Sequence, residues 1–226
     1  MTTLVRPTEN LSYIREESPS HSGSLRARLH EVMPLLESMS GLADPLLWAH
    51  SLRVGKMARE TGEVIGMRGG DLDQLEVAGY LHDIGRIIGG EAAPARPAGH
   101  PPRPTDNGAH CLRAAKIVSS LPWLTPIMPM VLFHHEYWDG SGVPAGLRGE
   151  SIPLAARIIA VVDAFDRMIG SSAPGAEQPI NKALETLRTE RGRLYDPEVV
   201  NAFIDACSLS LTRKHLWGRP HLDLQY

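Results

Sequence analysis

The sequence predicts an all-α protein, and two observations lead to this fold class. Several stretches place apolar residues three and four positions apart, which is the spacing of an amphipathic helix. Segments rich in Pro, Gly and Ser separate these stretches, and no stretch has a reliable strand pattern. The expected helices begin near Leu25, Pro45, Asp71, Asp106, Ile127, Pro153, Pro179 and Pro197.

Four of these helices carry a start signal. An acidic residue at or just before the first turn can accept hydrogen bonds from exposed backbone amides. The candidate caps are Asp44 before Pro45, Asp71 with Gln74 in a capping box, Asp106, and Asp196 before Pro197. In the first helix, Pro34 is expected to bend or shorten the element, and the segment 40–45 is expected to break the chain.

Composition narrows the classes of protein that the chain can represent. The 226 residues carry a formal net charge of −3, so binding to a nucleic acid polymer is not expected. The chain has neither a signal-peptide pattern nor an apolar run of about 18 residues, so we expect a cytoplasmic protein without membrane contact. Cys111 and Cys207 are interpreted as packed thiols. The expected organisation is a flexible tail over 1–24, one helical domain over 25–208 and an extension over 209–226.

The expected inward faces of five helices each carry a histidine or an aspartate. These residues are His50, His82, Asp83, His110, His134, His135 and Asp163. His50 alone would be interpreted as an ordinary core histidine, but burying so many imidazoles without partners costs several kcal/mol. A metal is the common reason for such a cluster, and seven ligands exceed what one ion accepts. The pattern therefore predicts two metal ions, an arrangement that suits phosphoester hydrolysis.

Three motifs in order resemble a known family. They are HDIG at 82–85, HHEYWDGSGVPAGLRGESIP at 134–153 and ARIIAVVDAFD at 156–166. Together they resemble the HD-GYP domain, the bacterial subgroup of HD phosphohydrolases that linearises cyclic di-GMP. The resemblance extends from about Leu46 to Phe203, and it implies a single helical bundle with a metal centre in its core.

The resemblance also implies roles for individual residues. His50, His82, Asp83 and Asp163 would hold one divalent ion, and His110, His134 and His135 the other, with Asp83 bridging both. Iron or manganese is the expected metal, and a hydroxide bridging the two ions would attack the phosphodiester. Asp83 and Arg86 are the expected catalytic residues, and Asp166 is expected either to contact substrate, to orient a ligand or to form a salt bridge.

Five departures from the family pattern affect mainly the substrate side. Leu46 stands where members with three metals carry a glutamate, which is why two ions are expected here. Arg86 replaces a lysine and can bind phosphate but cannot donate a proton. Val143 replaces the tyrosine of GYP, and residues 170–179 lack the usual basic residues. The Pro-rich segment 87–105 replaces a more regular one, and its Arg96 and Arg103 are candidate substrate contacts.

Two functions remain open at this point. The domain hydrolyses cyclic di-GMP or another phosphoester, or it binds metal without turnover and acts as a nucleotide sensor or a module for a signalling-protein partner.

The sequence also suggests roles for three further side chains beside the histidine pair. Glu136 and Asp139 are candidate acceptors for the ligand histidines, and Trp138 is either a packed aromatic or a stacking surface for guanine.

Overall fold

The computed structural model describes residues 25–89, 108–170 and 180–212. These ranges contain helices and turns without a β-strand, which confirms the all-α prediction. The helices are α1 (Leu25–Ala43), α2 (Pro45–Ile65), α3 (Gly70–Leu81), α4 (Ile84–Gly89), α5 (Ala109–Ser119), α6 (Met128–Leu132), α7 (Leu154–Ile169), α8 (Ile180–Thr189) and α9 (Pro197–Thr212), with short 3₁₀ helices at Pro122–Ile127 and Gly149–Ser151. Within the described ranges, every helix is too short or too polar to cross a bilayer.

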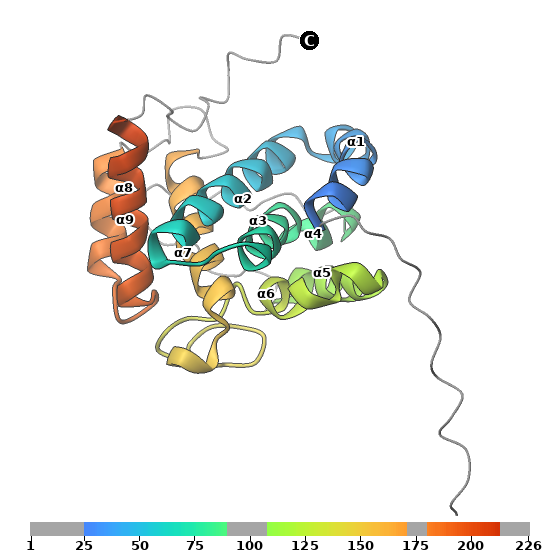
Figure 1. Ribbon diagram of the computed structural model, residues 1–226. Helices are drawn as coiled ribbons and strands as arrows, with labels where there is room; N and C mark the ends of the chain where they lie inside the picture. Colours follow the sequence, from blue (N-terminus) through green and yellow to red (C-terminus); the bar gives the residue numbers. More distant parts are fainter. Residues whose placement is uncertain (1–24, 90–107, 171–179, 213–226) are drawn as a thin grey trace, which may run out of the picture.

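Helices α2 and α7 occupy the centre of the bundle. Helix α2 packs against α3, α7 and α9, while α7 also contacts α6 and α8. Helices α8 and α9 lie on one side of α7, and α5 and α6 lie on the other (Figure 1). Eleven of the sixteen residues of α7 are buried, among them Asp163 and Asp166. Buried carboxylates need partners, so the polar site must lie where α7 meets its neighbours.

Two of the four predicted helix caps are confirmed. The Asp44 carboxylate accepts hydrogen bonds from the amides of Leu46 and Leu47, and Pro45 follows as the first helical residue. The Asp196 carboxylate accepts from Glu198 and Val199 at the start of α9. These caps satisfy amides that have no partner within the helix.

The prediction for the end of the first helix is wrong. Helix α1 continues through Pro34 to Ala43, so the expected break at 40–45 shrinks to Asp44 alone. Its apolar side, which includes Leu29 and Leu36, joins the main core, and this packing outweighs the lost hydrogen bond at the proline. Helix α9 continues to Thr212, which lies beyond the domain boundary expected at residue 208.

The capping box at Asp71 is also wrong. Helix α3 begins at Gly70, with Gly69 in the capping position and without a side-chain cap. Asp71 lies in the first turn instead, where its charge still favours the helix dipole. Helix α5 begins at Ala109 after Gly108, whose φ of 82° suits glycine. The proposed cap Asp106 lies outside the described residues.

Helices α2 and α3 approach each other so closely that only glycine fits at the crossing. A Cβ on Gly79 would lie 2.5 Å from the Cα of Gly55 and 2.9 Å from its amide nitrogen. Both neighbours are backbone atoms, which cannot rotate away. The crossing fixes the position of α2, which carries His50, relative to α3, which leads into His82.

Replacing Gly79 with alanine is therefore expected to lower the free energy of unfolding by about 2 to 3 kcal/mol, because the helices must separate. For a chain of this size, the thermal midpoint falls by about 4 to 12 °C. Gly70→Ala is the matched control, since Gly70 is in the same helix and a Cβ added there would meet nothing within 4 Å. Equal midpoints for the two variants would contradict the close crossing.

The loop before α7 is held by acidic side chains. The Glu136 carboxylate accepts hydrogen bonds from the amides of Ala145 and Leu147, at 2.6 and 3.1 Å. The Asp139 carboxylate accepts from the amide of Ser141 at 2.9 Å. Both acids therefore hold the backbone of the loop, and the prediction that they accept hydrogen bonds from the ligand histidines is wrong. Asp139→Ala is accordingly expected to loosen this loop without removing a partner of a predicted ligand.

Candidate metal centre

All seven predicted ligands converge in the interior of the bundle. They form two groups of buried side chains, and within each group one donor atom per residue lies within 4.8 Å of the others. The first group is His50, His82, Asp83 and Asp163, and the second is His110, Cys111, His134 and His135. Cys111 is the one member that the ligand prediction did not include.

Both adjacent pairs of ligands lie just beyond the end of a helix. His82 and Asp83 follow α3, and His134 and His135 follow α6. At a helix end the backbone leaves the helical spacing, so two consecutive side chains can face the same space. The imidazole rings confirm this convergence, because His82 and His134 have centroids 5.0 Å apart and His134 and His135 have centroids 4.1 Å apart.

A glycine brings the two groups together. A Cβ on Gly85 would lie 2.1 Å from the carbonyl oxygen of His110 and 2.8 Å from the amide nitrogen of Ala114. Helix α4 can therefore contact α5 only because the HDIG motif ends in glycine. The contact places His110 Nε2 3.3 Å from Asp83 Oδ1.

The orientation of the imidazoles leaves lone pairs directed into the site. His82 Nδ1 is 2.7 Å from the carbonyl oxygen of Gly79, and His134 Nδ1 is 2.7 Å from that of Val131. A carbonyl oxygen only accepts hydrogen bonds, so each Nδ1 carries a proton, and a ring that is neutral then has its lone pair on Nε2. The Nε2 atoms of His82, His134 and His135 are buried without a hydrogen-bond partner among the described residues.

These orphaned nitrogens fit a metal centre. An unsatisfied polar atom in the interior costs about 1 to 3 kcal/mol, and a bound cation would remove that cost for all three. Imidazole and carboxylate are suitable ligands for several divalent ions. A Nδ1–H group held by a carbonyl oxygen is also the usual arrangement behind a metal-bound histidine.

Asp166 contacts the first group through His50. Its Oδ2 lies 2.7 Å from His50 Nδ1, and both of its oxygens accept hydrogen bonds from the Arg53 guanidinium at 2.7 Å. Burial alone would lower the pKa of His50, but hydrogen bonds with Asp163 and Asp166 raise it above its ordinary value. This geometry favours a residue that orients His50 over one that contacts substrate.

Asp83 lies between the two groups. Its Oδ1 is 3.3 Å from His110 Nε2 and 3.9 Å from His134 Nε2, whereas its Oδ2 is 3.6 Å from His82 Nε2. Asp163 faces the first group only, with Oδ1 at 2.9 Å from His50 Nε2 and 3.4 Å from His82 Nε2. Asp83 thus has the position required of a bridging ligand.

Two arginines, Arg86 buried and Arg167 half-buried, neutralise these carboxylates. Arg86 donates through Nε to Asp83 Oδ1 at 2.9 Å, and its guanidinium lies 3.1 Å from His110 Nε2. Arg167 donates to Asp83 Oδ2 and, at 2.7 Å, to Asp163 Oδ1. Burial alone would raise the pKa of Asp83 and of Asp163, but nearby charges, chiefly that of Arg167, hold both well below the ordinary value.

Sequence reasoning missed Arg167. A signal was present, because Arg167 follows Asp163 by four residues and so shares its helix face. The contact with Asp83 spans 84 positions and depends on how α7 packs. It therefore could not be read from local spacing.

Acidification is expected to destabilise the metal-free protein. Burial, with the charges of His82 and His110, lowers the pKa of His134 to about 3. Burial and the neighbouring His134 also lower the pKa of His135 well below its ordinary value. In the unfolded chain a histidine titrates near about 6.5, so below that pH the unfolded state binds protons that the folded state does not. His134 alone then lowers the free energy of unfolding by about 2 kcal/mol between pH 7 and pH 5.

The raised pKa of His50 does not offset this loss, because its stabilising contribution is already complete below pH 6.5. Urea midpoints measured with a chelator across this range test the expectation. In His134→Gln, the loss of unfolding free energy between pH 7 and pH 5 should be smaller by the contribution of His134, about 2 kcal/mol. A wild-type profile that is level from pH 7 to pH 5 would contradict the burial of neutral imidazoles.

Four other residues singled out in the sequence remain to be placed. Arg96 and Arg103 fall outside the described residues. Leu46 is 63% exposed and brings no ligand atom. Trp138 has the Arg157 guanidinium 5.7 Å from its ring centre, which supports the packed aromatic.

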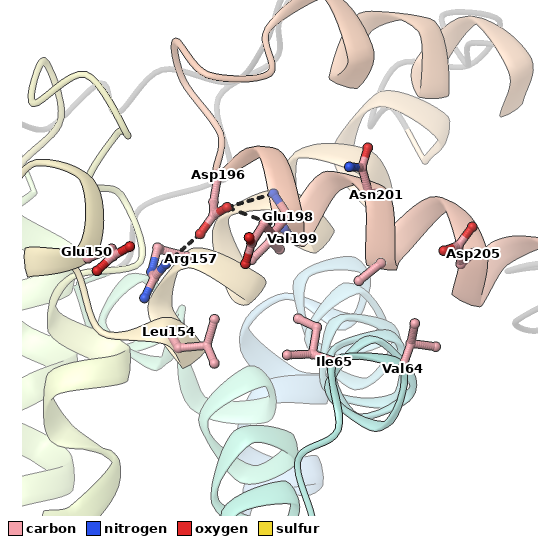
Figure 2. A pocket seen from close by; sticks show the side chains of 11 residues that line it. Val64, Ile65, Glu150, Leu154, Arg157, Asp196, Glu198, Val199, Asn201 and Asp205 are labelled. Atoms are coloured by element: carbon pink, nitrogen blue, oxygen red, sulfur yellow. Dashed lines mark hydrogen bonds and ion pairs between the residues drawn. The ribbon is translucent and has the colours of Figure 1, made fainter.

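A surface cavity of about 550 Å³ lies away from these groups, at the N-terminal end of α9. Val64, Ile65 and Leu154 are among its apolar lining residues, and Glu198 and Asp205 are among its acidic ones. Figure 2 shows Asp196 at its edge, bonded to Arg157 and to the start of α9. None of the predicted ligands lines this cavity.

Comparison with known proteins agrees with the motifs. The sequence profile described as HD domain matches residues 34–199. The chain is 33% identical over 179 residues to a cyclic di-GMP phosphodiesterase of Thermotoga maritima, covering 78% of this chain and 49% of the relative. It is 30% identical over 227 residues to the cyclic di-GMP phosphodiesterase response regulator RpfG of Xanthomonas campestris, covering 88% and 59%. The chain thus spans about half the length of these curated relatives.

Solved structures share the fold. A cyclic GMP-AMP specific phosphodiesterase of V. cholerae matches with a TM-score of 0.58 at 20% identity, over 76% of this chain and 50% of that one. The HD domain of the L. monocytogenes phosphodiesterase PgpH, in complex with cyclic-di-AMP, matches with a TM-score of 0.52 at 18% identity, over 85% and 100%. The chain therefore belongs to the HD domain family, in agreement with its resemblance to the HD-GYP members.

Proposed function

We propose that the chain is a metal-dependent phosphodiesterase that hydrolyses a cyclic dinucleotide, with cyclic di-GMP as the favoured substrate. One observation carries the proposal. Seven buried ligand side chains form two adjoining groups with one carboxylate between them, and three of their nitrogens lack a hydrogen-bond partner among the described residues. The names of the relatives support a cyclic dinucleotide as substrate.

The proposed centre holds two divalent ions, with iron or manganese expected. His50, His82, Asp83 and Asp163 would hold one ion, and His110, His134 and His135 the other, with Asp83 shared. Two ions at such a site supply a water of lowered pKa and positive charge for the phosphoryl oxygens.

The chain's own side chains would orient the ligands and bind the substrate. Asp166 fixes the ring of His50, so its proposed role is positioning. Arg86 carries a buried guanidinium next to Asp83 and His110, where a phosphate oxygen of the substrate would accept its hydrogen bonds. Arg167 is a second candidate for this task, and Arg96 and Arg103 of the segment 87–105 remain proposed contacts.

A second function is favoured by the same arginines. Arg86 and Arg167 already balance the charges of Asp83 and Asp163, so the carboxylates are paired without a cation. A domain of this kind could bind a cyclic dinucleotide without cleaving it and pass the signal to a partner protein.

Purification without oxygen, followed by metal analysis and chromatography of cyclic dinucleotides, separates the two functions. About two ions per chain and a linear product from cyclic di-GMP would support hydrolysis. Cyclic GMP-AMP and cyclic di-AMP in parallel test the substrate class, and exhaustive chelation is the control. Binding without product would favour the sensor, while a chain that retains no metal would overturn the proposal.

A further inference from the structure

The second ligand group contains a thiol. Cys111 is fully buried, and its Sγ lies 3.4 Å from His110 Nε2 and 3.9 Å from His134 Nδ1. Its sulfur belongs to the set of donor atoms that lie within 4.8 Å of one another, together with one nitrogen each from His110, His134 and His135. The thiol therefore lies beside the donor atoms of this group, and its nearest one is His110 Nε2.

Independent atoms in the same group indicate that a cation belongs there. His134 Nε2 and His135 Nε2 are buried without a hydrogen-bond partner among the described residues. The Nδ1 of His134 is held by the carbonyl oxygen of Val131, so the ring cannot turn its lone pair elsewhere without losing that bond. A ligand of positive charge is what these nitrogens lack.

The two groups differ in the chemistry of their donors. The first offers two imidazoles and two carboxylates, a set that suits harder ions such as Mn²⁺. The second offers three imidazoles and a sulfur, with Asp83 Oδ1 at its border. Three nitrogens and a thiolate form a set that favours thiophilic ions such as Zn²⁺ or Co²⁺.

We propose that Cys111 is a ligand of the second metal ion, and that its sulfur makes this site select thiophilic ions. The proposal rests on the metal centre proposed above and adds a ligand to it. On binding, the sulfur forms a bond to the ion and its proton leaves to solvent, so neither an oxidant nor a reductant is needed.

Cobalt provides a direct test. Full-length metal-free protein is titrated with Co²⁺, and bound cobalt is quantified while the near-ultraviolet spectrum is recorded. A thiolate bound to Co²⁺ gives a charge-transfer band that imidazole and carboxylate ligands do not give. We expect the band in the wild type and in Cys207→Ser, and its loss in Cys111→Ser.

Cys207 is a matched control. It is the other cysteine of the chain, it is buried in α9, and burial raises the pKa of its thiol to about 12. Far-ultraviolet circular dichroism shows whether either variant keeps its helices. If Cys111→Ser unfolds, a second measurement uses the wild type, in which methylation of each cysteine by a small thiol reagent is followed by mass spectrometry. Bound Zn²⁺ should slow the methylation of Cys111 and leave the rate at Cys207 unchanged.

Metal competition measures the selectivity. Relative to the wild type, Cys111→Ser should lose at least about tenfold in its preference for Zn²⁺ over Mn²⁺, since only the thiophilic ion gains from the sulfur. Cobalt that binds without the band, or a preference unchanged by the substitution, would overturn the role of Cys111 while leaving the metal centre intact. A chain that binds no cobalt would overturn the metal centre itself.

Discussion

Replacing Asp83 with asparagine is expected to lower metal affinity and cyclic dinucleotide turnover by at least about 100-fold. Removing a residue that only hydrogen-bonds to a metal ligand already lowers metal affinity or activity by about 10- to 100-fold. Asp83 should matter more, because its carboxylate faces both ligand groups. Asparagine keeps the size of the side chain but removes its charge. The variant also leaves Arg86 and Arg167 without the buried acid that they share.

The measurement is metal content per chain after dialysis, together with product formation from cyclic di-GMP. Asp205→Asn is the control, because Asp205 is an exposed acid on α9. Circular dichroism separates loss of metal from loss of fold. A variant that keeps both ions would show that Asp83 does not bridge the two groups.

Local patterns predicted the helices and the convergence of the seven side chains for a physical reason. The ligands occupy inward positions of amphipathic helices, and the two adjacent pairs occupy helix ends, so spacing alone indicates that they converge. His50 on α2 and Asp163 on α7 share the face that packs into the core, and the structure places them 2.9 Å apart. What they bind remains a proposal.

Features that depend on packing between distant segments could not be predicted. Glu136 follows the histidine pair, yet its carboxylate faces the amides of a loop nine and eleven residues later. Cys111 follows His110 on α5, where neighbouring residues point in different directions, so spacing does not place its sulfur beside the ring of His134. Both cases require the three-dimensional path of the chain.

Arg167→Met is expected to weaken the metal-free protein and to strengthen metal binding. The guanidinium bonds to the oxygens of Asp163 and Asp83 that face the first ligand group, so it competes with the cation for the same charges. Without metal, the two buried carboxylates lose their partner, and the free energy of unfolding should fall by about 3 kcal/mol. With metal, the ion takes the place of the guanidinium, and its affinity should rise at least about tenfold.

Thermal midpoints with chelator and with excess Mn²⁺ measure both effects, since an ion that binds only the folded state raises the midpoint. The gap between the two midpoints should be larger in the variant than in the wild type. Arg53→Met removes a guanidinium from Asp166, which is not among the proposed ligands, so it should lower stability without tightening metal binding. If Arg167→Met instead binds Mn²⁺ more weakly, the guanidinium holds the carboxylates in place for the ion rather than competing with it. Arg167 would then help to hold the proposed ligands in place. Its pairing with Asp83 and Asp163 in the metal-free protein would no longer favour a sensor over an enzyme.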